Sequence, residues 1–303
     1  MSGLGLPTLA TDRQAPVVGV AGIGRMGNAI ALRLLERGVT LMVWNRNPTS
    51  IESLVSQGAA CAQTPSDLTT ACQVVLTSLS DDAALDAVYL SPQGLLQGET
   101  QGRLFVDTST VSPATVVRIG HLAAQVGASF VDAPVLGTVT PAREGRLIVM
   151  AGGTPHSVAR ARATLEHIAA VIHHVGNAGS GAAMKLAVNI PMAAYWAAMA
   201  DSFALAQACK LDPEQLVGII AASPAALAQL QLKLPVLLGR SVQVGYNIRG
   251  VMKDCEIIKR LAATNDLALP TLEATFTAFA AAVAGGWGNR DVAAAPRFQL
   301  VRE

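Results

Sequence analysis

A lysine and an asparagine four residues apart are the first candidates for chemistry in this chain. Lys185 and Asn189 lie in the stretch 179–189, and a spacing of four puts both side chains on one face of a helix. Apolar neighbours would partly desolvate the lysine and lower its pKa toward the range of an acid–base catalyst. Lys185 could then give a proton to a carbonyl oxygen during a reduction, while Asn189 holds that oxygen. The alternative is a surface lysine whose ammonium reaches water.

The second candidate is a glycine-rich turn near the start of the chain. It follows an apolar strand pattern and precedes a helix pattern from Met26 to Arg37. In a G-x-G-x-x-G motif of this context, the glycines make a tight turn, admit a pyrophosphate to the backbone and pack the helix on the sheet. The helix N-terminus then faces the phosphates. The motif predicts a dinucleotide site made by Gly22, Ile23, Gly24, Arg25, Met26 and Gly27.

The residues after the next predicted strand bear on which dinucleotide is bound. An acidic residue there would bind the ribose 2′-hydroxyl of NAD. The chain has Asn45 and Arg46 instead. Asn45 carries no charge to repel a 2′-phosphate, and Arg46 can pair with that group through charge-assisted hydrogen bonds. We therefore predict NADPH in preference to NADH, the alternative being that Arg46 is only a solvated surface residue.

Two kinds of segment must position these residues. Short apolar runs alternate with helix-length stretches in the first half, which predicts an α/β fold with a doubly wound parallel sheet covered on both faces. The runs are 17–22, 40–45, 73–79, 103–109, 129–135, 146–153 and 170–176. After Gly181 the strand pattern ends. The helical segments expected there are 180–209, 213–222, 224–238, 247–265 and 270–286.

The pattern divides the chain into three parts: a flexible arm over 1–15, an NADP-binding Rossmann domain over 16–177, and an all-α substrate and dimerisation domain over 178–303. Ligand sites of such sheets lie at the carboxyl ends of the strands, so nicotinamide and substrate are expected in a cleft between the two domains. The long apolar helices would leave much surface wet in a monomer. They predict a homodimer or a dimer of dimers.

Composition and charge exclude several classes of function. Basic residues number 22 and acidic residues 21, so the chain has no basic footprint for nucleic acid or for a membrane surface. Four cysteines without paired spacing argue against a disulfide framework and a zinc site. We see no signal peptide or membrane span, and expect a cytoplasmic protein that binds a small molecule and no metal. Asp254, Glu256 and Lys259 are interpreted as a solvated helix face.

Over about 17–290 the chain resembles the β-hydroxyacid dehydrogenases, which include 3-hydroxyisobutyrate dehydrogenase and the glyoxylate/succinic semialdehyde reductases. The resemblance rests on Val18–Gly27 and on Gly179–Asn189. It implies a C-terminal domain like that of 6-phosphogluconate dehydrogenase, an acid–base role for Lys185 and an orienting role for Asn189. It also implies further contacts with the cofactor from Leu79, Ser80, Thr110 and Lys253, the last of which reaches the substrate as well.

One motif departs from the family pattern. The family's substrate loop typically has serine and two glycines after Asp-Ala-Pro-Val, whereas this chain has Leu136, Gly137 and Thr138. The resemblance implies that the missing hydroxyl would hold a substrate carboxylate. The amides of Gly137 and Thr138, with the Thr138 hydroxyl, could still receive an anion. A longer or less polar substrate is therefore plausible.

These observations together predict an NADPH-dependent oxidoreductase. We expect it to reduce a small aldehyde or semialdehyde, or in reverse to oxidise a hydroxy acid, with Lys185 as general acid or base. An imine reductase or reductive aminase shares the architecture and the Trp44–Arg46 pattern, but such enzymes generally lack the lysine. The other alternative is a non-catalytic NADPH-binding interaction module, against which the pair of Lys185 and Asn189 argues.

Overall fold

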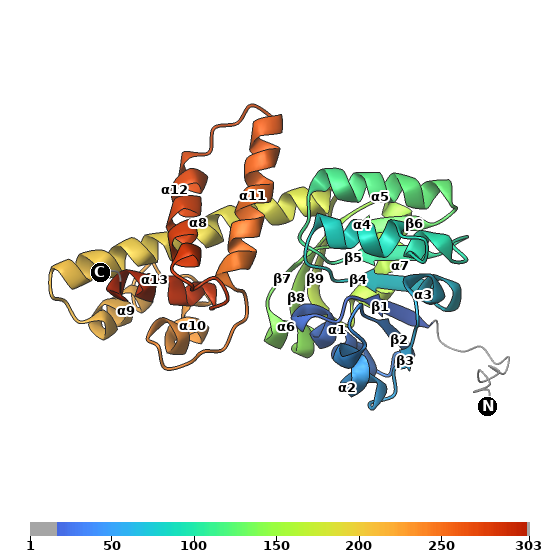
Figure 1. Ribbon diagram of the computed structural model, residues 1–303, viewed down its shortest axis with the longest axis horizontal. Helices are drawn as coiled ribbons and strands as arrows, with labels where there is room; N and C mark the ends of the chain where they lie inside the picture. The colour runs from blue at the N-terminus through green and yellow to red at the C-terminus, as the bar shows by residue number, and fades with distance from the viewer. Residues whose placement is uncertain (1–16, 302–303) are drawn as a thin grey trace. The chain divides into compact units, whose positions relative to one another are not determined.

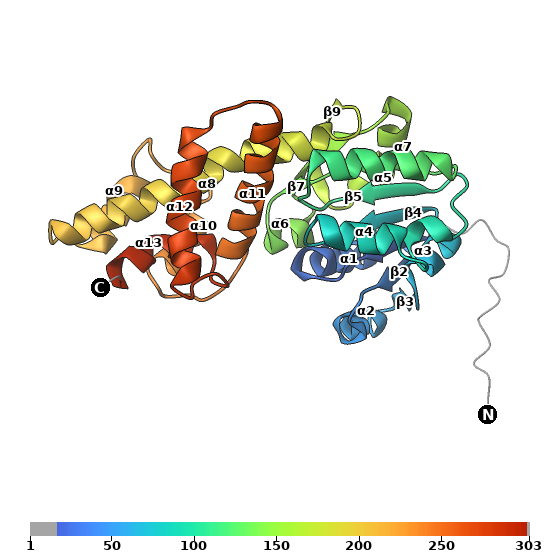
Figure 2. The same cartoon turned by 45° about the horizontal axis from the view of Figure 1, so that its top comes forward.

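The computed structural model describes residues 17–301, so the predicted arm over 1–15 lies outside the described residues. The described chain forms two compact units (Figures 1 and 2). The first unit holds residues 17–109 and 117–178, and the second holds residues 110–116 and 179–301. Strands occur in the first unit, and the second is built from helices.

A nine-stranded sheet forms the centre of the first unit. Its strands are β1 (Val18–Ala21), β2 (Leu41–Trp44), β3 (Ala60–Cys61), β4 (Val74–Thr77), β5 (Leu104–Asp107), β6 (Ser129–Asp132), β7 (Val135–Leu136), β8 (Leu147–Gly152) and β9 (Ala169–Gly176). Their order is β3-β2-β1-β4-β5-β6-β8-β7, and β9 pairs with β8. Each apolar run predicted as a strand corresponds to one, except that the run 129–135 is divided between β6 and β7. β3 was missed because two residues are too short to show a pattern.

The sequence pattern predicted a parallel sheet, and this prediction is wrong at one edge of the sheet. β8 runs antiparallel to both β6 and β7. A parallel return needs a crossover of about a dozen residues or more. Only residues 137–146, with the short helix α6 (Val139–Glu144), separate β7 from β8, so the chain returns in the opposite direction.

Helices cover both faces of this sheet. They are α1 (Arg25–Glu36), α2 (Glu52–Val55), α3 (Pro65–Ala71), α4 (Asp82–Leu90), α5 (Pro113–Gln125), α6 and α7 (Pro155–Leu165), with short 3₁₀ turns η1 (Pro48–Ile51) and η2 (Leu95–Gln97). β5 illustrates the arrangement because it is buried on both sides. Leu104 and Val106 belong to one apolar cluster with residues of α1 and α7. Phe105 points the other way and meets the Tyr89 ring of α4 edge-on at 5.4 Å.

The second unit packs helices around α8 (Ser180–Ala208). The others are α9 (Pro213–Ala221), α10 (Leu230–Leu237), α11 (Ile248–Thr264), α12 (Pro270–Ala284) and α13 (Ala295–Phe298), with 3₁₀ turns η3 (Val292–Ala294) and η4 (Gln299–Val301). Their shared core includes the large buried side chains of Trp196, Phe203 and Phe279. This order of a Rossmann-like sheet and then an all-helical unit confirms the predicted fold class. No helix of the described chain has the length and apolar character needed to cross a membrane.

One predicted helix is shorter than expected. The segment 224–238 becomes helical only from Leu230. The Ser223 hydroxyl accepts a hydrogen bond from the Ala225 amide at 3.1 Å, and the Ser223 carbonyl accepts one from Ala226. A serine that bonds the following backbone in this way stabilises a turn at the expense of a helix. The helix predicted from 224 is therefore wrong over its first turn and a half.

Candidate active site

The glycine-rich turn of the first unit leaves no room for side chains at two of its three glycines. Gly22 has φ of +92°, and a Cβ there would lie 2.4 Å from the Ser78 carbonyl oxygen. A Cβ on Gly27 would lie 1.9 Å from the Gly22 carbonyl oxygen, so α1 can begin against the turn only with glycine there. A Cβ on Gly24 would meet nothing within 4 Å. That open side is where a pyrophosphate approaches the backbone in this motif.

Asn45 closes the same turn from the end of β2. Its Oδ1 accepts a hydrogen bond from the Ile23 amide at 3.0 Å, and its Nδ2 donates to the Asn47 carbonyl at 3.0 Å. Asn45 therefore has a structural task besides lacking the charge that would repel a 2′-phosphate. Arg46 is exposed, and its side chain makes no hydrogen bond or ion pair with another described residue. Its guanidinium is left available for an anion.

Leu79 follows β4 and lies against the glycine-rich turn, where a hydrogen bond with Ser109, itself bonded to Asp107, holds its backbone in place. A Cβ on Gly22 would lie 2.7 Å from Cδ2 of Leu79. The Leu79 amide donates to Ser109 Oγ at 2.9 Å, and Ser109 Oγ donates to Asp107 Oδ1 at 2.6 Å. The neighbouring Ser80 is exposed and its hydroxyl donates to Asp81. The first unit thus places Leu79 against the predicted dinucleotide turn.

Sequence reasoning did not single out Asp107, which the structure buries completely. Burial raises the pKa of this carboxyl to about 6, although hydrogen bonds from Ser109 and Thr77 work in the opposite direction. A signal was present, since a polar Asp-Thr-Ser run follows an otherwise apolar strand. The run alone does not show that Ser109 links Asp107 to the amide of Leu79.

In the second unit, Lys185 and Asn189 lie buried on one face of α8, as the spacing predicted. Their exposed fractions are 9% and 3%. Burial lowers the pKa of Lys185 to about 8; the Asp254 charge works against this shift and the Lys253 charge adds to it. The Lys185 side chain makes no hydrogen bond with another described residue. It is a buried amine with its proton free to be given to a ligand.

Asp254 organises the groups around Asn189. Its Oδ2 accepts hydrogen bonds from Nδ2 of Asn189 at 2.8 Å and from the hydroxyl of Tyr246, and its Oδ1 lies 2.8 Å from Nζ of Lys253. An ionised carboxylate only accepts, so this contact decides which way the Asn189 amide faces. Oδ1 of Asn189 is buried with no hydrogen-bond partner among the described residues. An unsatisfied buried acceptor of this kind calls for a donor from a ligand.

The interpretation of Asp254 as part of a solvated helix face is wrong. Asp254 is only 3% exposed. Helical periodicity places it within the apolar stripe of Val251, Cys255 and Ile258, all of which are buried. Its hydrogen-bond partners Asn189 and Tyr246 lie on α8 and before α11, and no local pattern links them to it. The neighbouring Glu256 is exposed, as predicted.

The remaining predicted residues divide between the units. Lys253 also donates a hydrogen bond to the Thr110 carbonyl, and both belong to the second unit. Leu136 ends β7 in the first unit, where it pairs with Ile148 of β8. Gly137 has φ of +123°, and Thr138 precedes α6 without capping it through its side chain. The structure thus groups Lys185, Asn189, Lys253 and Thr110, and separately groups the glycine-rich turn, Asn45 and Leu79.

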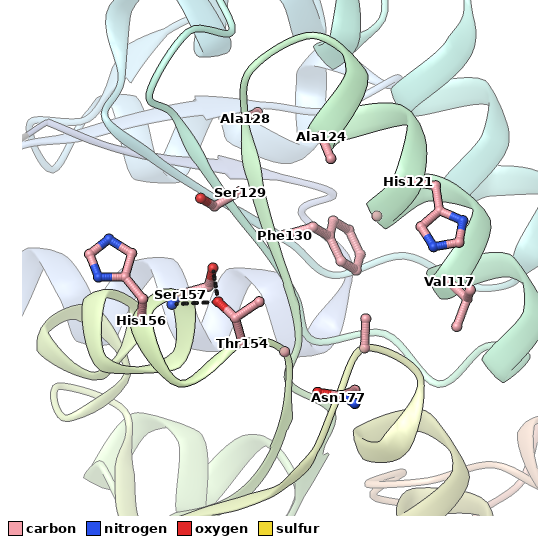
Figure 3. A pocket seen from close by; sticks show the side chains of 13 residues that line it. Val117, His121, Ala124, Ala128, Ser129, Phe130, Thr154, His156, Ser157 and Asn177 are labelled. Carbon is pink, nitrogen blue, oxygen red and sulfur yellow. Dashed lines mark hydrogen bonds between the residues drawn. The ribbon is translucent and has the colours of Figure 1, made fainter.

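Two further features of the described chain bear on ligand chemistry. No group of three or more His, Cys, Asp or Glu side chains in the described residues could hold a metal ion. A cavity of about 470 Å³ in the first unit lies over the Phe130 ring, between His121 of α5 and His156 of α7 (Figure 3). None of the predicted site residues lines this cavity.

Family models match nearly the whole described chain. Residues 17–176 match the NAD binding domain of 6-phosphogluconate dehydrogenase, and residues 179–298 match the NAD-binding domain of NADP-dependent 3-hydroxyisobutyrate dehydrogenase. The fold, the glycine-rich turn and the buried lysine of α8 define a dinucleotide-dependent oxidoreductase. The chain belongs to the 3-hydroxyisobutyrate dehydrogenase family of NAD(P)-dependent dehydrogenases and reductases, as the resemblance in the sequence predicted.

Individual relatives agree with this assignment. The chain is 29% identical to glyoxylate/succinic semialdehyde reductase 2 of Arabidopsis thaliana, over 91% of this chain and 77% of the relative. The solved structure of Psf3 in complex with NADP⁺ and 2-OPP has a TM-score of 0.85 and 26% identity, covering 93% and 99% of the two chains. An imine reductase from Myxococcus stipitatus shares the fold at a TM-score of 0.64 and 21% identity, covering 94% and 99%.

The open side of Gly24 leads to a test of the dinucleotide site. We expect Gly24→Ala to leave the thermal stability of the apoprotein unchanged, because its Cβ meets no protein atom. The same Cβ would occupy the space of the pyrophosphate, so NADPH should bind at least about tenfold more weakly by calorimetry.

Gly218→Ala is the matched control, because Gly218 lies in α9 and a Cβ there also meets nothing within 4 Å. Equal NADPH affinity in Gly24→Ala and Gly218→Ala would remove the turn from the binding site.

Proposed function

We propose that this protein uses NADPH to reduce a small aldehyde or semialdehyde, with Lys185 supplying the proton. The main observation in support is that Lys185 is buried and has a lowered pKa. It lies on the same helix face as Asn189, whose side-chain amide is oriented by Asp254. A non-catalytic module that only binds NADPH has no use for this pair. The reductase named among the relatives supports the same chemistry.

The charges of the second unit favour a substrate that carries a carboxylate. Lys185 and Lys253 bring two positive charges, and Asp254 brings one negative charge. The remaining positive charge, in a partly desolvated setting, attracts a small anion. Substrates with a carboxylate beside the aldehyde fit this balance.

The residues of the first unit fit the cofactor through their backbone. The turn from Gly22 to Gly27 would hold the pyrophosphate, with Gly24 giving the close approach, and Arg46 would hold the 2′-phosphate. Leu79, Ser80, Thr110 and Lys253 are proposed as further contacts. When bound, the cofactor supplies a hydride to the carbonyl carbon.

The protein's own contribution is proton supply and alignment. Lys185 holds a proton at Nζ that the carbonyl oxygen takes up as it is reduced. With a pKa of about 8, the amine is protonated at neutral pH yet releases its proton more readily than an ordinary lysine. The Asn189 amide, held by Asp254 through one Nδ2 hydrogen, can donate its other Nδ2 hydrogen to the reacting carbonyl oxygen beside Lys185, and its Oδ1 can accept from the hydroxyl of the alcohol. Effective alignment of this kind can supply much of the rate enhancement.

Imine reduction is the second candidate, and Leu136 favours it. A branched apolar side chain replaces the hydroxyl that would help to hold a carboxylate, which suits an uncharged substrate. Lys185 argues for the carbonyl reaction. NADPH oxidation with glyoxylate, semialdehydes, uncharged aldehydes and cyclic imines separates the two. Turnover of imines alone would replace the proposal, and NADPH binding without any turnover would favour the non-catalytic module.

Two further expectations belong to this proposal. The helices of the second unit leave large apolar side chains exposed, among them Leu205, Ile219 and Leu232. Exposed apolar surface of this kind supports a homodimer or a dimer of dimers. The cytoplasmic location stays a prediction of the sequence.

The role of Lys185 can be tested by substitution and by pH. Lys185→Ala should lower turnover by ~10²–10⁴ while NADPH affinity stays near the wild-type value. Protonated Lys185 is the acid, so kcat/KM for reduction should fall as pH rises above about 8. Oxidation of the alcohol needs the neutral amine and should rise over the same range.

The control is Lys259→Ala, which removes a lysine of α11 that pairs with Glu273 of α12 at 2.6 Å. A small loss of turnover in Lys185→Ala, no larger than in this control, would assign the proton to another group.

Cofactor preference can be tested at Arg46. The wild type should bind NADPH at least about tenfold more tightly than NADH, and Arg46→Ala should remove most of that difference. Arg37→Ala, which removes another exposed arginine of the first unit, should keep the preference. Equal affinities of the wild type for the two cofactors would contradict the argument from Asn45 and Arg46.

Substrate preference can be tested at Leu136. Restoring a hydroxyl with Leu136→Ser should raise kcat/KM for short carboxylated aldehydes relative to uncharged ones, because the anion gains a donor. Val171→Ser, an exposed position of β9, controls for loss of an apolar side chain. An unchanged ratio would remove this loop from the account of specificity.

A further inference from the structure

The hydroxyl of Tyr246 shares an acceptor with Asn189. It donates to Oδ2 of Asp254, the same oxygen that accepts from Nδ2 of Asn189. Tyr246 lies immediately before Asn247, the N-cap of α11, whereas Asn189 comes from α8. Two donors from separate segments therefore hold one carboxylate oxygen in place.

We propose that Tyr246 is a positioning residue for the reaction: its hydroxyl keeps Oδ2 of Asp254 turned toward Asn189. The second Nδ2 hydrogen of Asn189 is thereby kept free for the reacting carbonyl oxygen, and the amide oxygen is kept free for the hydroxyl of the alcohol. This inference rests on the proposed function, in which Lys185 and Asn189 act on the reacting oxygen. Tyr246 itself touches neither of these two residues through a hydrogen bond. It acts through Asp254.

The backbone of Tyr246 is fixed independently of its side chain. Oδ2 of Asp291 accepts from the Gly245 amide at 2.8 Å, the Tyr246 amide at 3.2 Å and Nζ of Lys233 at 2.7 Å. The Tyr246 carbonyl accepts from the Val292 amide at 2.8 Å. Asp291 is only 1% exposed, so these hydrogen bonds are shielded from water. The phenol is presented to Asp254 from a preorganised segment.

The contact also affects the charge that Lys185 experiences. Asp254 raises the pKa of Lys185 and Lys253 lowers it, and both lie on α11. A hydroxyl that donates to a carboxylate draws part of its negative charge away from other neighbours. Burial and the Asp254 charge raise the pKa of the Tyr246 phenol well above its usual value, so it remains a donor at working pH. Losing the hydroxyl should therefore raise the pKa of Lys185.

Tyr246→Phe tests the proposal because it removes the hydroxyl and keeps the ring. The matched control is Tyr195→Phe, which removes another half-buried hydroxyl of the second unit, one that accepts from the Leu227 amide at 3.4 Å. The chain has five lysines, so apoprotein labelled with [ε-¹³C]lysine gives few resonances to titrate by NMR. The resonance absent from Lys185→Ala identifies Lys185. This readout needs neither cofactor nor turnover.

In Tyr246→Phe we expect the Lys185 titration to move up by about half a pH unit or more. We also expect kcat to fall about tenfold, the scale of one lost hydrogen bond to a charged group, with NADPH affinity unchanged. In Tyr195→Phe both quantities should match the wild type. A Tyr246→Phe protein with wild-type Lys185 titration and kcat would overturn the inference.

Loss of thermal stability in Tyr246→Phe without a shift of Lys185 would also overturn it, since the tyrosine would then serve the fold alone. A failure of the proposed function would be recognised by a different result. Lys185→Ala would retain turnover in that case, whatever Tyr246→Phe does to the Lys185 resonance.

Discussion

The Asp254 carboxylate lies almost out of reach of water, and a buried charge is costly unless hydrogen bonds and an opposite charge compensate it. Asn189, Tyr246 and Lys253 provide that compensation from α8, from the segment before α11 and from α11 itself. Satisfying the carboxylate thereby decides how the Asn189 amide faces. The geometry proposed for proton supply is a consequence of neutralising one buried charge.

Lys185 is also buried in low-dielectric surroundings, but its charge is not compensated as that of Asp254 is. No described side chain accepts a hydrogen bond from it, so burial acts on its ammonium without full compensation and lowers the pKa. Close pairing with a carboxylate would have kept the proton on the amine and made it a poor acid. Asp254 is instead engaged by Asn189, Tyr246 and Lys253, which leaves Lys185 able to give its proton away.

The cofactor side is built from backbone more than from side chains. Gly22 and Gly27 are required because carbonyl oxygens occupy the space of a side chain, whereas Gly24 is required only if a ligand does. Such constraints are visible in a sequence, because glycines at this spacing between an apolar strand and a helix are typical of a dinucleotide-binding turn. The strand runs, the helix face shared by Lys185 and Asn189, and the order of the two folds were predictable for a similar reason: each follows from a local pattern.

Contacts between residues that are distant in sequence could not be predicted from local patterns. The pattern of α11 alone made Asp254 a solvated residue, and local patterns gave no role to Tyr246, Asp107 or Ser109. Asp254 bonds Asn189, 65 residues away, and Ser109 bonds the amide of Leu79, 30 residues away, and no periodic pattern in the sequence indicates such a pairing. The sequence by itself determined the family, most of the secondary structure and the residue types available for chemistry, since these depend on local pattern and composition. Tertiary structure alone decided which carboxylate is buried, which amide it orients and how far the pKa of Lys185 falls, because desolvation and charge act through space.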